Sequence, residues 1–458
     1  MTDIVNELWD FCNYLRHDGI TYGDYIEQLT YLLFLKMANE KDIKIPDECD
    51  WNDLIEYSGS DLLNKYSTIL LTLSKEKGML GDIFAQSLSR FTSPTNLKKL
   101  LNLIDKREWT SLDVDMKAIA YEGLLEKYAA EEKGAGQYFT PRAIIRSIIR
   151  CVKPDFRNSP EYTIHDPACG TGGFLIGAFD WIMKETENGA RLNVKDRERL
   201  VKRTFSGMDN VQNTRRLALM NCFLHELEVT IYFGDSLGDG PHVSKRYDVI
   251  LTNPPFGKGV GGNPLRDDFL YSTSNKQLNF LQHCFTILKK RGECVIVVPD
   301  NVLFENSGRD IRENLLKSCN LHTILRLPEG TFNPYSTGTK ANVIFFRKGG
   351  PTDKIWIYDL RTNIGNINKG NPLKDTLFVD FENNYHQNPR KESDRFKGFT
   401  NKEIIERDYN FDIFWINDNS IVTNLPDPYI LANEINDSLE STLQSFRILS
   451  KELKENEG

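Results

Sequence analysis

Short β-rich segments alternate with stretches of helix length from residue 162 onward, and this alternation limits the possible folds more than any other feature. Neighbouring parallel strands need a crossover connection between them, which is usually a helix. Seven strands are predicted, at residues 162–165, 204–208, 229–233, 247–251, 294–298, 322–327 and 342–346. We therefore predict an α/β fold with a Rossmann-like, mostly parallel sheet of seven strands and helices on both faces.

The segments on either side of this sheet are predicted to be helical. Ile4, Leu8 and Leu15 recur at helical spacing, so we expect an N-terminal helical domain over residues 1–130. Residues 131–420 would form the domain that contains the sheet, with the polar stretch 380–398 as a loop or linker. Apolar residues near the end again advance by three or four. This spacing predicts a helical tail over 421–458 that packs on this chain or docks a partner.

The first predicted strand runs into a glycine-rich turn that is followed by a helical stretch. The turn reads Asp166-Pro167-Ala168-Cys169-Gly170-Thr171-Gly172-Gly173. Glycine lets a backbone approach a ligand closely, and ligands of open parallel sheets bind beyond the carboxyl ends of the strands. The sixth position of the dinucleotide pattern is Leu175 rather than a small residue, and no phosphate-binding lysine follows. A ligand with a nucleoside but no phosphate fits better, and S-adenosylmethionine is the common one.

Acidic residues end the next two predicted strands. Asp209 follows the second strand, where a carboxylate can accept hydrogen bonds from both ribose hydroxyls. Asp235 follows the third strand and can accept from an adenine amino group. Either aspartate alone is equally well explained as the cap of the next helix. The succession of glycine turn, acid and acid along three strands favours a cofactor site.

The fourth predicted strand ends in the tetrapeptide Asn253-Pro254-Pro255-Phe256. Two consecutive prolines cannot continue a central strand, so the chain is held in a stiff turn beyond the sheet edge. The Asn253 side-chain carbonyl and the Pro254 backbone carbonyl can each accept one N–H of an aromatic amino group, while positive charge develops on its nitrogen. Phe256 can stack on a flipped base. Alone, such a string also arises as an ordinary turn with a core phenylalanine.

These motifs together resemble the amino-methyltransferases of DNA, and specifically the modification subunit of type I restriction-modification systems. The resemblance extends over most of the chain, including the segments 136–142, 327–332 and 407–415. It implies a class I methyltransferase sheet, S-adenosylmethionine as the cofactor and N6 of an extruded adenine as the methyl acceptor. It also implies that the methionine end of the cofactor is lined by Gln137, Tyr138, Phe139, Thr140, Pro141 and Arg142, beside Thr171, Gly172 and Gly173.

The same resemblance implies roles for Asp209 and for partner subunits. Asp209 would bind the ribose, although many members of the family carry glutamate at this position. The subunit would act on double-stranded DNA in a complex with a specificity subunit, which chooses the sequence, a second copy of itself and a restriction subunit. The formal net charge of −8 agrees with this dependence on partners, because phosphate contacts need a basic surface.

Composition excludes several other classes of protein. The apolar run at residues 31–35 is far too short to cross a bilayer, so we expect no membrane partner and a cytoplasmic location. The eight cysteines lack the paired spacings of zinc or redox sites and are interpreted as reduced packing residues. The seven histidines form no pattern of metal ligands, and we expect no metal.

Some alternatives stay open at this point. A protein-glutamine methyltransferase uses a similar tetrapeptide, but it has no need of the long helical front or the tail. A silent scaffold is disfavoured by the intact tetrapeptide and glycine turn. The residues alone do not separate adenine from cytosine, and only the resemblance favours adenine. The glycine-rich segment after Phe256 is either a loop that closes over DNA or an ordinary surface loop. Arg146 and Arg150 are interpreted as solvated rather than phosphate-binding.

Overall fold

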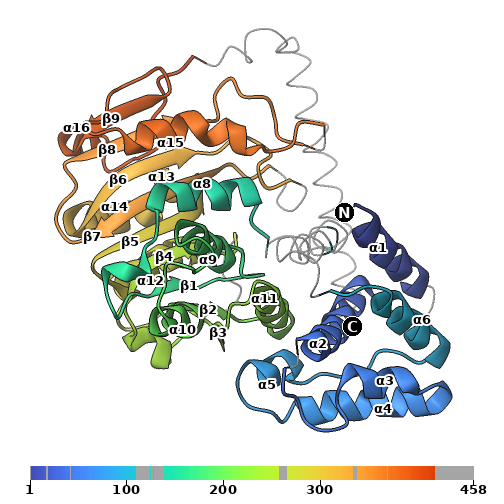
Figure 1. Cartoon of the computed structure of the whole chain (residues 1–458). Helices are drawn as coiled ribbons and strands as arrows, with labels where there is room; N and C mark the ends of the chain where they lie inside the picture. The colour runs from blue at the N-terminus through green and yellow to red at the C-terminus, as the bar shows by residue number, and fades with distance from the viewer. Residues whose placement is uncertain are drawn as a thin grey trace, which may run out of the picture. The chain divides into compact units, whose positions relative to one another are not determined.

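The structure is a computed structural model that describes residues 2–16, 19–41, 43–109, 124, 127, 139–256, 266–333, 338–368 and 370–417. Residues Met1–Leu360 and Gly365–Ile413 belong to one compact unit, and Arg361–Ile364 group with Phe414–Gly458 in another. The first unit contains every helix and strand given below (Figure 1). In the described part of the chain, no helix is long and apolar enough to cross a membrane.

The described N-terminal residues are helical, as predicted. Their helices are α1 (Thr2–Arg16), α2 (Tyr22–Glu40), α3 (Trp51–Glu56), α4 (Gly59–Leu73), α5 (Gly78–Phe84) and α6 (Pro94–Asp105). Helix α2 begins after Thr21, whose hydroxyl accepts a hydrogen bond from the Asp24 N–H at 3.1 Å. Leu29, Leu32 and Leu35 of this helix are fully buried. A helix buried on nearly all sides lies at the centre of its layer, and α2 has this position.

A single sheet has the strand order β3-β2-β1-β4-β5-β7-β6-β8-β9. Its strands are β1 (Ile164–Asp166), β2 (Phe205–Asp209), β3 (Thr230–Phe233), β4 (Tyr247–Thr252), β5 (Leu288–Pro299), β6 (Cys319–Arg326), β7 (Ala341–Lys348), β8 (Lys354–Asp359) and β9 (Phe396–Thr400). Neighbours among β1 to β5 pair in parallel, and β7 lies antiparallel between β5 and β6. The carboxyl ends of β1, β2 and β4 therefore meet at one edge.

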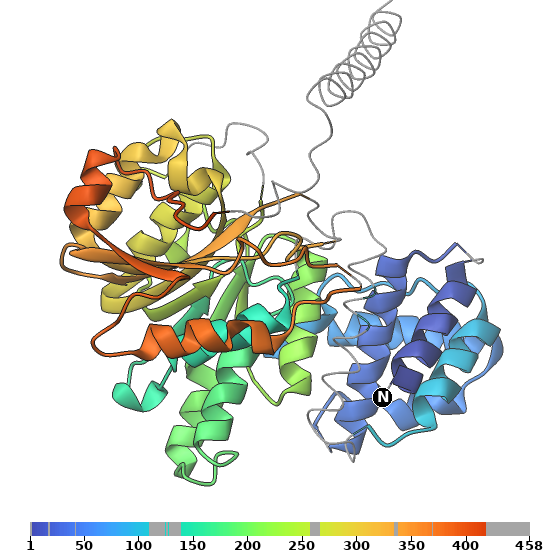
Figure 2. The same cartoon turned by 90° about the horizontal axis from the view of Figure 1, so that it is seen from above.

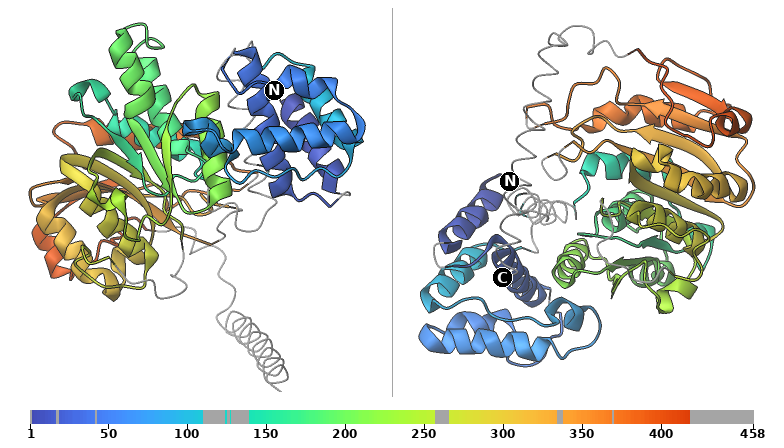
Figure 3. Two further views of the ribbon diagram at one scale, coloured as in Figure 1. Left: turned by 90° about the horizontal axis from the view of Figure 1, so that it is seen from below. Right: turned by 180° about the vertical axis from the view of Figure 1, so that it is seen from behind.

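Helices cover both faces of this sheet (Figure 2). They are α8 (Arg142–Val152), α9 (Gly173–Glu185), α10 (Val194–Arg203), α11 (Gln212–Leu224), α12 (Lys276–Ile287), α13 (Asn301–Phe304), α14 (Arg309–Ser318), α15 (Val379–His386) and α16 (Asn401–Glu406). Helices α8, α9 and α15 lie on one face, whereas α12 and α14 lie on the other and face the viewer in the right-hand panel of Figure 3. Burial on both faces explains why the central strands are apolar along most of their length.

Helices α8 and α9 approach each other closely through two glycines. A Cβ atom on Gly173 would lie 2.8 Å from the Ile145 side chain, and one on Gly177 would lie 2.6 Å from it. Only a residue without a side chain permits this approach while Ile145 keeps its position. The beginning of α8 is thereby packed against the beginning of α9, next to the glycine turn.

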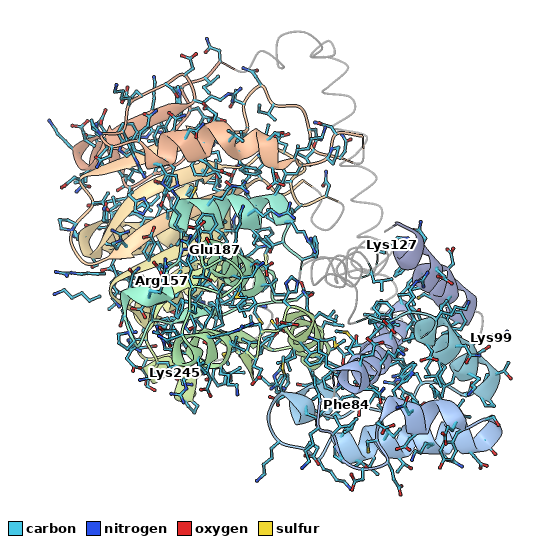
Figure 4. All side chains as sticks on the ribbon, in the orientation of Figure 1. Phe84, Lys99, Lys127, Arg157, Glu187 and Lys245 are labelled. Carbon is cyan, nitrogen blue, oxygen red and sulfur yellow. The ribbon has the colours of Figure 1, made fainter. Side chains whose placement is uncertain are left out.

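Helix α11 joins the N-terminal helices to the sheet through a buried arginine. Arg216 is only 2% exposed, and its Nη1 lies 2.7 Å from the Glu27 Oε1 of α2. Its remaining N–H groups donate to the backbone carbonyls of Ile83 and Ala85, at the end of α5. Phe84, labelled in Figure 4, adds an apolar contact between α5 and α2 because its ring stacks on Tyr31 at 5.1 Å.

The predicted fold class is confirmed, but the strand count of seven is wrong. Strands β8 and β9 extend the sheet beyond β6. Residues 380–398 were expected to be a loop or linker, and they instead hold most of α15 and the start of β9. The few apolar residues in this polar stretch are sufficient to anchor it, since Phe381 and Phe396 are both fully buried. The predicted domain boundaries at 130 and 420, and the terminal helix, lie outside the described residues.

Candidate functional site

The glycine turn follows β1 at the carboxyl edge of the sheet, as predicted. Asp166 is the last residue of β1, and its Oδ1 accepts a hydrogen bond from the Ala168 N–H at 3.0 Å. Burial raises the pKa of Asp166 to about 7. This side chain shapes the turn from inside, because it is only 1% exposed and faces the backbone of the residues that follow.

Positive backbone dihedrals at two glycines let the turn enter α9. Gly170 has a φ of 53° and Gly172 a φ of 83°, a region that favours glycine. Gly172 precedes the first residue of α9, and a Cβ atom there would lie 3.3 Å from the Cys222 Sγ. Asn221 stabilises the same turn, since its Nδ2 donates to the Thr171 carbonyl at 3.0 Å. The turn therefore lies directly against α11.

Asp209 is the last residue of β2, Asp235 lies just beyond the end of β3, and both line the same cleft as this turn. Asp209 accepts from the Gly170 N–H at 3.2 Å and from the Val211 N–H at 2.8 Å. Burial raises its pKa to about 6. Its bond to Val211 closes a two-residue turn and is not a helix cap, because Val211 is itself the N-cap residue of α11. Its bond to Gly170 ties it to the glycine turn. Asp235 is exposed and accepts from the Leu237 N–H at 3.0 Å.

The tetrapeptide leaves β4 at the same edge of the sheet. The Asn253 Nδ2 donates to the Thr140 hydroxyl oxygen at 3.0 Å. The other end of this amide, Oδ1, is shielded from solvent and accepts no hydrogen bond from the described residues. The Pro255 carbonyl accepts from the Gln277 Nε2 at 3.0 Å, which fixes the turn from α12. An unpaired buried carbonyl oxygen is costly, and such groups gather where a ligand completes the bonding.

Phe256, the last residue of the tetrapeptide, packs against a second aromatic ring. Its ring meets the Phe332 ring edge-on, with 5.5 Å between centroids. Phe332 ends the segment 327–332, so the structure brings together two of the motifs on which the resemblance rests. Phe332 is 3% exposed and packs Phe256 from one side.

One cleft of about 1050 Å³, partly open to solvent, collects most of the predicted site residues. Those that line it are Phe139, Thr140, Arg142, Asp166, Ala168, Gly170, Thr171, Gly173, Asp209, Asp235, Asn253 and Pro255. Four predicted residues lie next to the lining without belonging to it, namely Pro141, Gly172, Pro254 and Phe256. Gln137, Tyr138 and the glycine-rich segment 257–265 are outside the described residues. A partly open cleft that is lined by both polar and apolar groups suits a small organic ligand or cofactor.

Several lining residues were missed by the sequence analysis. Asn221 lies in the apolar stretch of α11 and is 1% exposed, and its Oδ1 has no partner in the described part of the chain. A lone asparagine among buried apolar residues is a signal that was available. Lys276 and Phe280, from α12, also line the cleft, and no local pattern marks them.

Arg146 and Arg150 of α8 were expected to be solvated, and Arg146 is indeed exposed, whereas Arg150 is only partly so. Arg150 is partly buried, and its Nε lies 2.7 Å from the Glu382 carboxylate of α15. Arg146 lies 3.0 Å from the Asp375 carboxylate. Both guanidinium groups therefore connect α8 to the segment around α15, and only Arg142 lines the cleft.

Comparison with known proteins identifies the family. A family model described as N-6 DNA Methylase matches residues 113–419, and one described as HsdM N-terminal domain matches residues 4–104. The methylase subunit of the type I restriction enzyme StySPI from Salmonella potsdam is 36% identical over 98% of this chain and 95% of its own length. The EcoKI methylase subunit from Escherichia coli strain K12 has the same identity and coverage.

Solved structures agree with the sequence relatives. One solved structure, described as the structural basis of complex assembly and conformational transition of the type I R-M system, superposes on this chain with a TM-score of 0.76. It is 28% identical and covers 100% of this chain and 99% of its own. The family named from the motifs is thus confirmed. With its cleft at the carboxyl edge of a Rossmann-like sheet, the chain belongs to the N-6 DNA methylase family, among the methylase subunits of type I restriction enzymes.

Proposed function

We propose that this chain is the DNA adenine-N6 methyltransferase subunit of a type I restriction-modification enzyme and uses S-adenosylmethionine as its methyl donor. Family membership supports the reaction class. The observation that carries the residue assignments is the Asn253 amide. Its unpaired Oδ1 is held beside the cleft that the glycine turn also lines, so a hydrogen-bond acceptor and a cofactor-type turn occur together.

The donor and acceptor groups of the cleft suit a nucleoside ligand without phosphates. Asp209 and Asp235 supply carboxylate acceptors for the ribose hydroxyls and the adenine amino group, respectively. The turn at Gly170 to Gly173 has no lysine that would neutralise a phosphate. We assign the methionine end to the segment that contains Phe139, Thr140 and Arg142, beside the turn.

The remaining cofactor assignments follow from position. Asp166 and Ala168 hold the start of the turn, and Thr171 lines the cleft beside them. Gly172 sets the backbone direction into α9. Pro141 is the N-cap residue of α8, and its own backbone is extended, with a ψ of 131°. Gln137 and Tyr138 are assigned to the same end of the cofactor on the family resemblance alone.

The tetrapeptide performs the chemistry by accepting hydrogen bonds. Bound S-adenosylmethionine supplies an electrophilic methyl group. The Asn253 Oδ1 and the Pro254 carbonyl each accept one N–H of the target amino group, which localises the nitrogen lone pair and stabilises the positive charge that develops. With S-adenosylmethionine bound, an N–C bond would form as the sulfonium C–S bond breaks, and the surplus proton would then leave to water. Pro255 keeps the turn stiff, and Phe256 stacks on the extruded base.

DNA and partner subunits complete this enzyme. The net charge of −8 provides little general attraction for phosphates, so a specificity subunit has to hold and choose the double-stranded DNA. A second copy of this chain and a restriction subunit are the further partners that the family implies. The predicted domains at 1–130, 131–420 and 421–458 would divide docking, chemistry and subunit contact among them.

Co-expression with the specificity subunit of the same system tests the proposed reaction. DNA from those cells is digested to nucleosides and analysed by mass spectrometry, with the Asn253→Ala variant of the complex as the matched control. We expect N6-methyladenine with the unaltered chain and none above background with the variant. N4-methylcytosine, or unmodified DNA, would overturn the proposal.

A further inference from the structure

We propose that Thr140 is a positioning residue, which orients the Asn253 side-chain amide so that its carbonyl oxygen, and not its amino group, faces the target base. This inference rests on the proposed function of Asn253. The observation behind it is the hydrogen bond from the Asn253 Nδ2 to the Thr140 Oγ1, at 3.0 Å. The two residues are 113 positions apart in the sequence and line the same cleft.

The orientation of an asparagine amide matters because its two ends are alike in size and opposite in function. The Oδ1 end accepts hydrogen bonds, whereas the Nδ2 end only donates. The amino group of a base presents two N–H donors, so a flipped amide would place donor against donor and remove the acceptor that catalysis needs. Rotation by half a turn changes the shape of the side chain very little. A specific partner at one end therefore has to define the orientation.

Both partners of this hydrogen bond are held by rigid neighbours. Thr140 precedes Pro141 at the start of α8, and α8 packs tightly on α9 through Ile145 and Gly173. Asn253 follows the buried strand β4, and the Gln277 side chain fixes the turn through the Pro255 carbonyl. The separation of the hydroxyl and the amide is thus set by the fold. The unpaired Oδ1 is the end that remains for the substrate.

A hydroxyl group can also donate, so Thr140 fixes the orientation of the amide only while its own hydrogen points to another acceptor. Threonine has one O–H donor and two acceptor lone pairs. Accepting from the Asn253 Nδ2 occupies one lone pair and leaves the O–H for another acceptor in the cleft. An acceptor on a bound ligand would keep this O–H pointed away from Asn253. Only the lone pairs of the Thr140 oxygen would then be available to Asn253, so its Nδ2 would face Thr140. Ligand binding would thereby favour the orientation in which the Asn253 Oδ1 faces the base.

Two variants of Thr140 separate positioning from packing. Thr140→Val keeps the shape of the side chain but removes the acceptor, and Thr140→Ser keeps the acceptor. In the complex with its specificity subunit and DNA, we expect Thr140→Val to lower the single-turnover rate of methyl transfer roughly tenfold, as for loss of a hydrogen bond that orients a catalytic dipole. Thr140→Ser should restore most of the rate. Because Thr140 is also assigned to the methionine end of the cofactor, the dissociation constant for S-adenosylmethionine is measured by calorimetry, and the rates are compared at saturating S-adenosylmethionine, where a change in affinity does not contribute.

A variant of Asn253 itself provides the sharpest control. Asn253→Asp places a carboxylate at the site, whose two oxygens both accept, so it has no orientation to lose. Adding Thr140→Val to Asn253→Asp should therefore reduce the rate by a smaller factor than the same change in the unaltered enzyme. An equal factor in both backgrounds, or weakened cofactor binding with an unchanged rate, would overturn the role of Thr140.

Failure of this inference is distinguishable from failure of the proposed function. If the unaltered complex transfers no methyl group to DNA, the proposed function is wrong whatever Thr140 does. If the unaltered complex methylates adenine and Thr140→Val keeps its full rate, only the positioning role is wrong.

Discussion

Glu27 of α2 and Arg216 of α11 form a buried ion pair, with 2.7 Å between the Oε1 and Nη1 atoms. Glu27 also accepts a hydrogen bond from the Tyr31 hydroxyl at 2.6 Å. On the same helix α11, Asn221 donates to the Thr171 carbonyl in the glycine turn. One helix thus contacts both the N-terminal helices and the turn that we assign to the cofactor. Loss of the ion pair is therefore expected to disturb both the N-terminal helices and the glycine turn.

Arg216→Met should destabilise the chain strongly. The substitution leaves the Glu27 carboxylate buried without its charged partner, which typically costs about 3–5 kcal/mol. Chemical unfolding of the purified chain, followed by circular dichroism, measures this loss. The double variant Arg216→Met/Glu27→Leu removes both charges and should recover a large part of the stability. A single variant as stable as the unaltered chain would show that the pair contributes nothing.

Gly172→Ala should weaken cofactor binding as well as stability. Its φ of 83° disfavours any residue with a Cβ atom by about 1–2 kcal/mol, and the added methyl group would press on Cys222. Gly189→Ala is a matched control, because its φ is 78° and it lies after the far end of α9, outside the glycine turn. Both variants should lose stability in thermal unfolding. Only Gly172→Ala should reduce affinity in calorimetric titration with S-adenosylmethionine, and equal affinity in the two variants would contradict the assigned turn.

Cofactor binding should weaken as the pH falls below about 6, the pKa to which burial raises Asp209. Only the ionised carboxylate accepts from both ribose hydroxyls, so protonation removes binding by up to about tenfold for each pH unit. The raised pKa also means that folding favours protonated Asp209, whose contribution to stability is lost as the pH rises through the same value. Titrations across this range measure the affinity.

Asp209→Asn is the control for this pH dependence. The amide of this variant does not titrate. Its affinity for S-adenosylmethionine, although weaker, should therefore not change with pH over the range in which the affinity of the unaltered chain falls. The same slope in both proteins would remove Asp209 from the ribose site.

The residues at strand ends were predictable from the sequence. The glycine turn, Asp209 and Asn253 each follow a β-rich segment directly, and parallel strands bring their carboxyl ends to one edge. The position of each residue directly after a β-rich segment was therefore enough to place these groups in one cleft. The acceptor role of the Asn253 carbonyl followed from its chemistry, while its free Oδ1 became visible only in three dimensions.

Contacts between distant segments were not predictable in the same way. The partner of Asn253 is Thr140, which reaches it only because α8 packs on α9. Strand β9 was hidden in a polar stretch, because Phe396 is the only buried residue of the strand itself and the strand shows no alternating pattern. Lys276 and Phe280 of α12 resembled ordinary helix residues. These features depend on tertiary packing, which overrides local composition.

The most direct test of the central claim is methyl transfer by Asn253→Ala, measured in a single turnover on DNA with the specificity subunit present. We expect this variant to bind S-adenosylmethionine with unchanged affinity and to transfer the methyl group at least ~100-fold more slowly, as for loss of a preorganised dipole at a developing charge. A variant that methylates adenine at the normal rate would contradict the account.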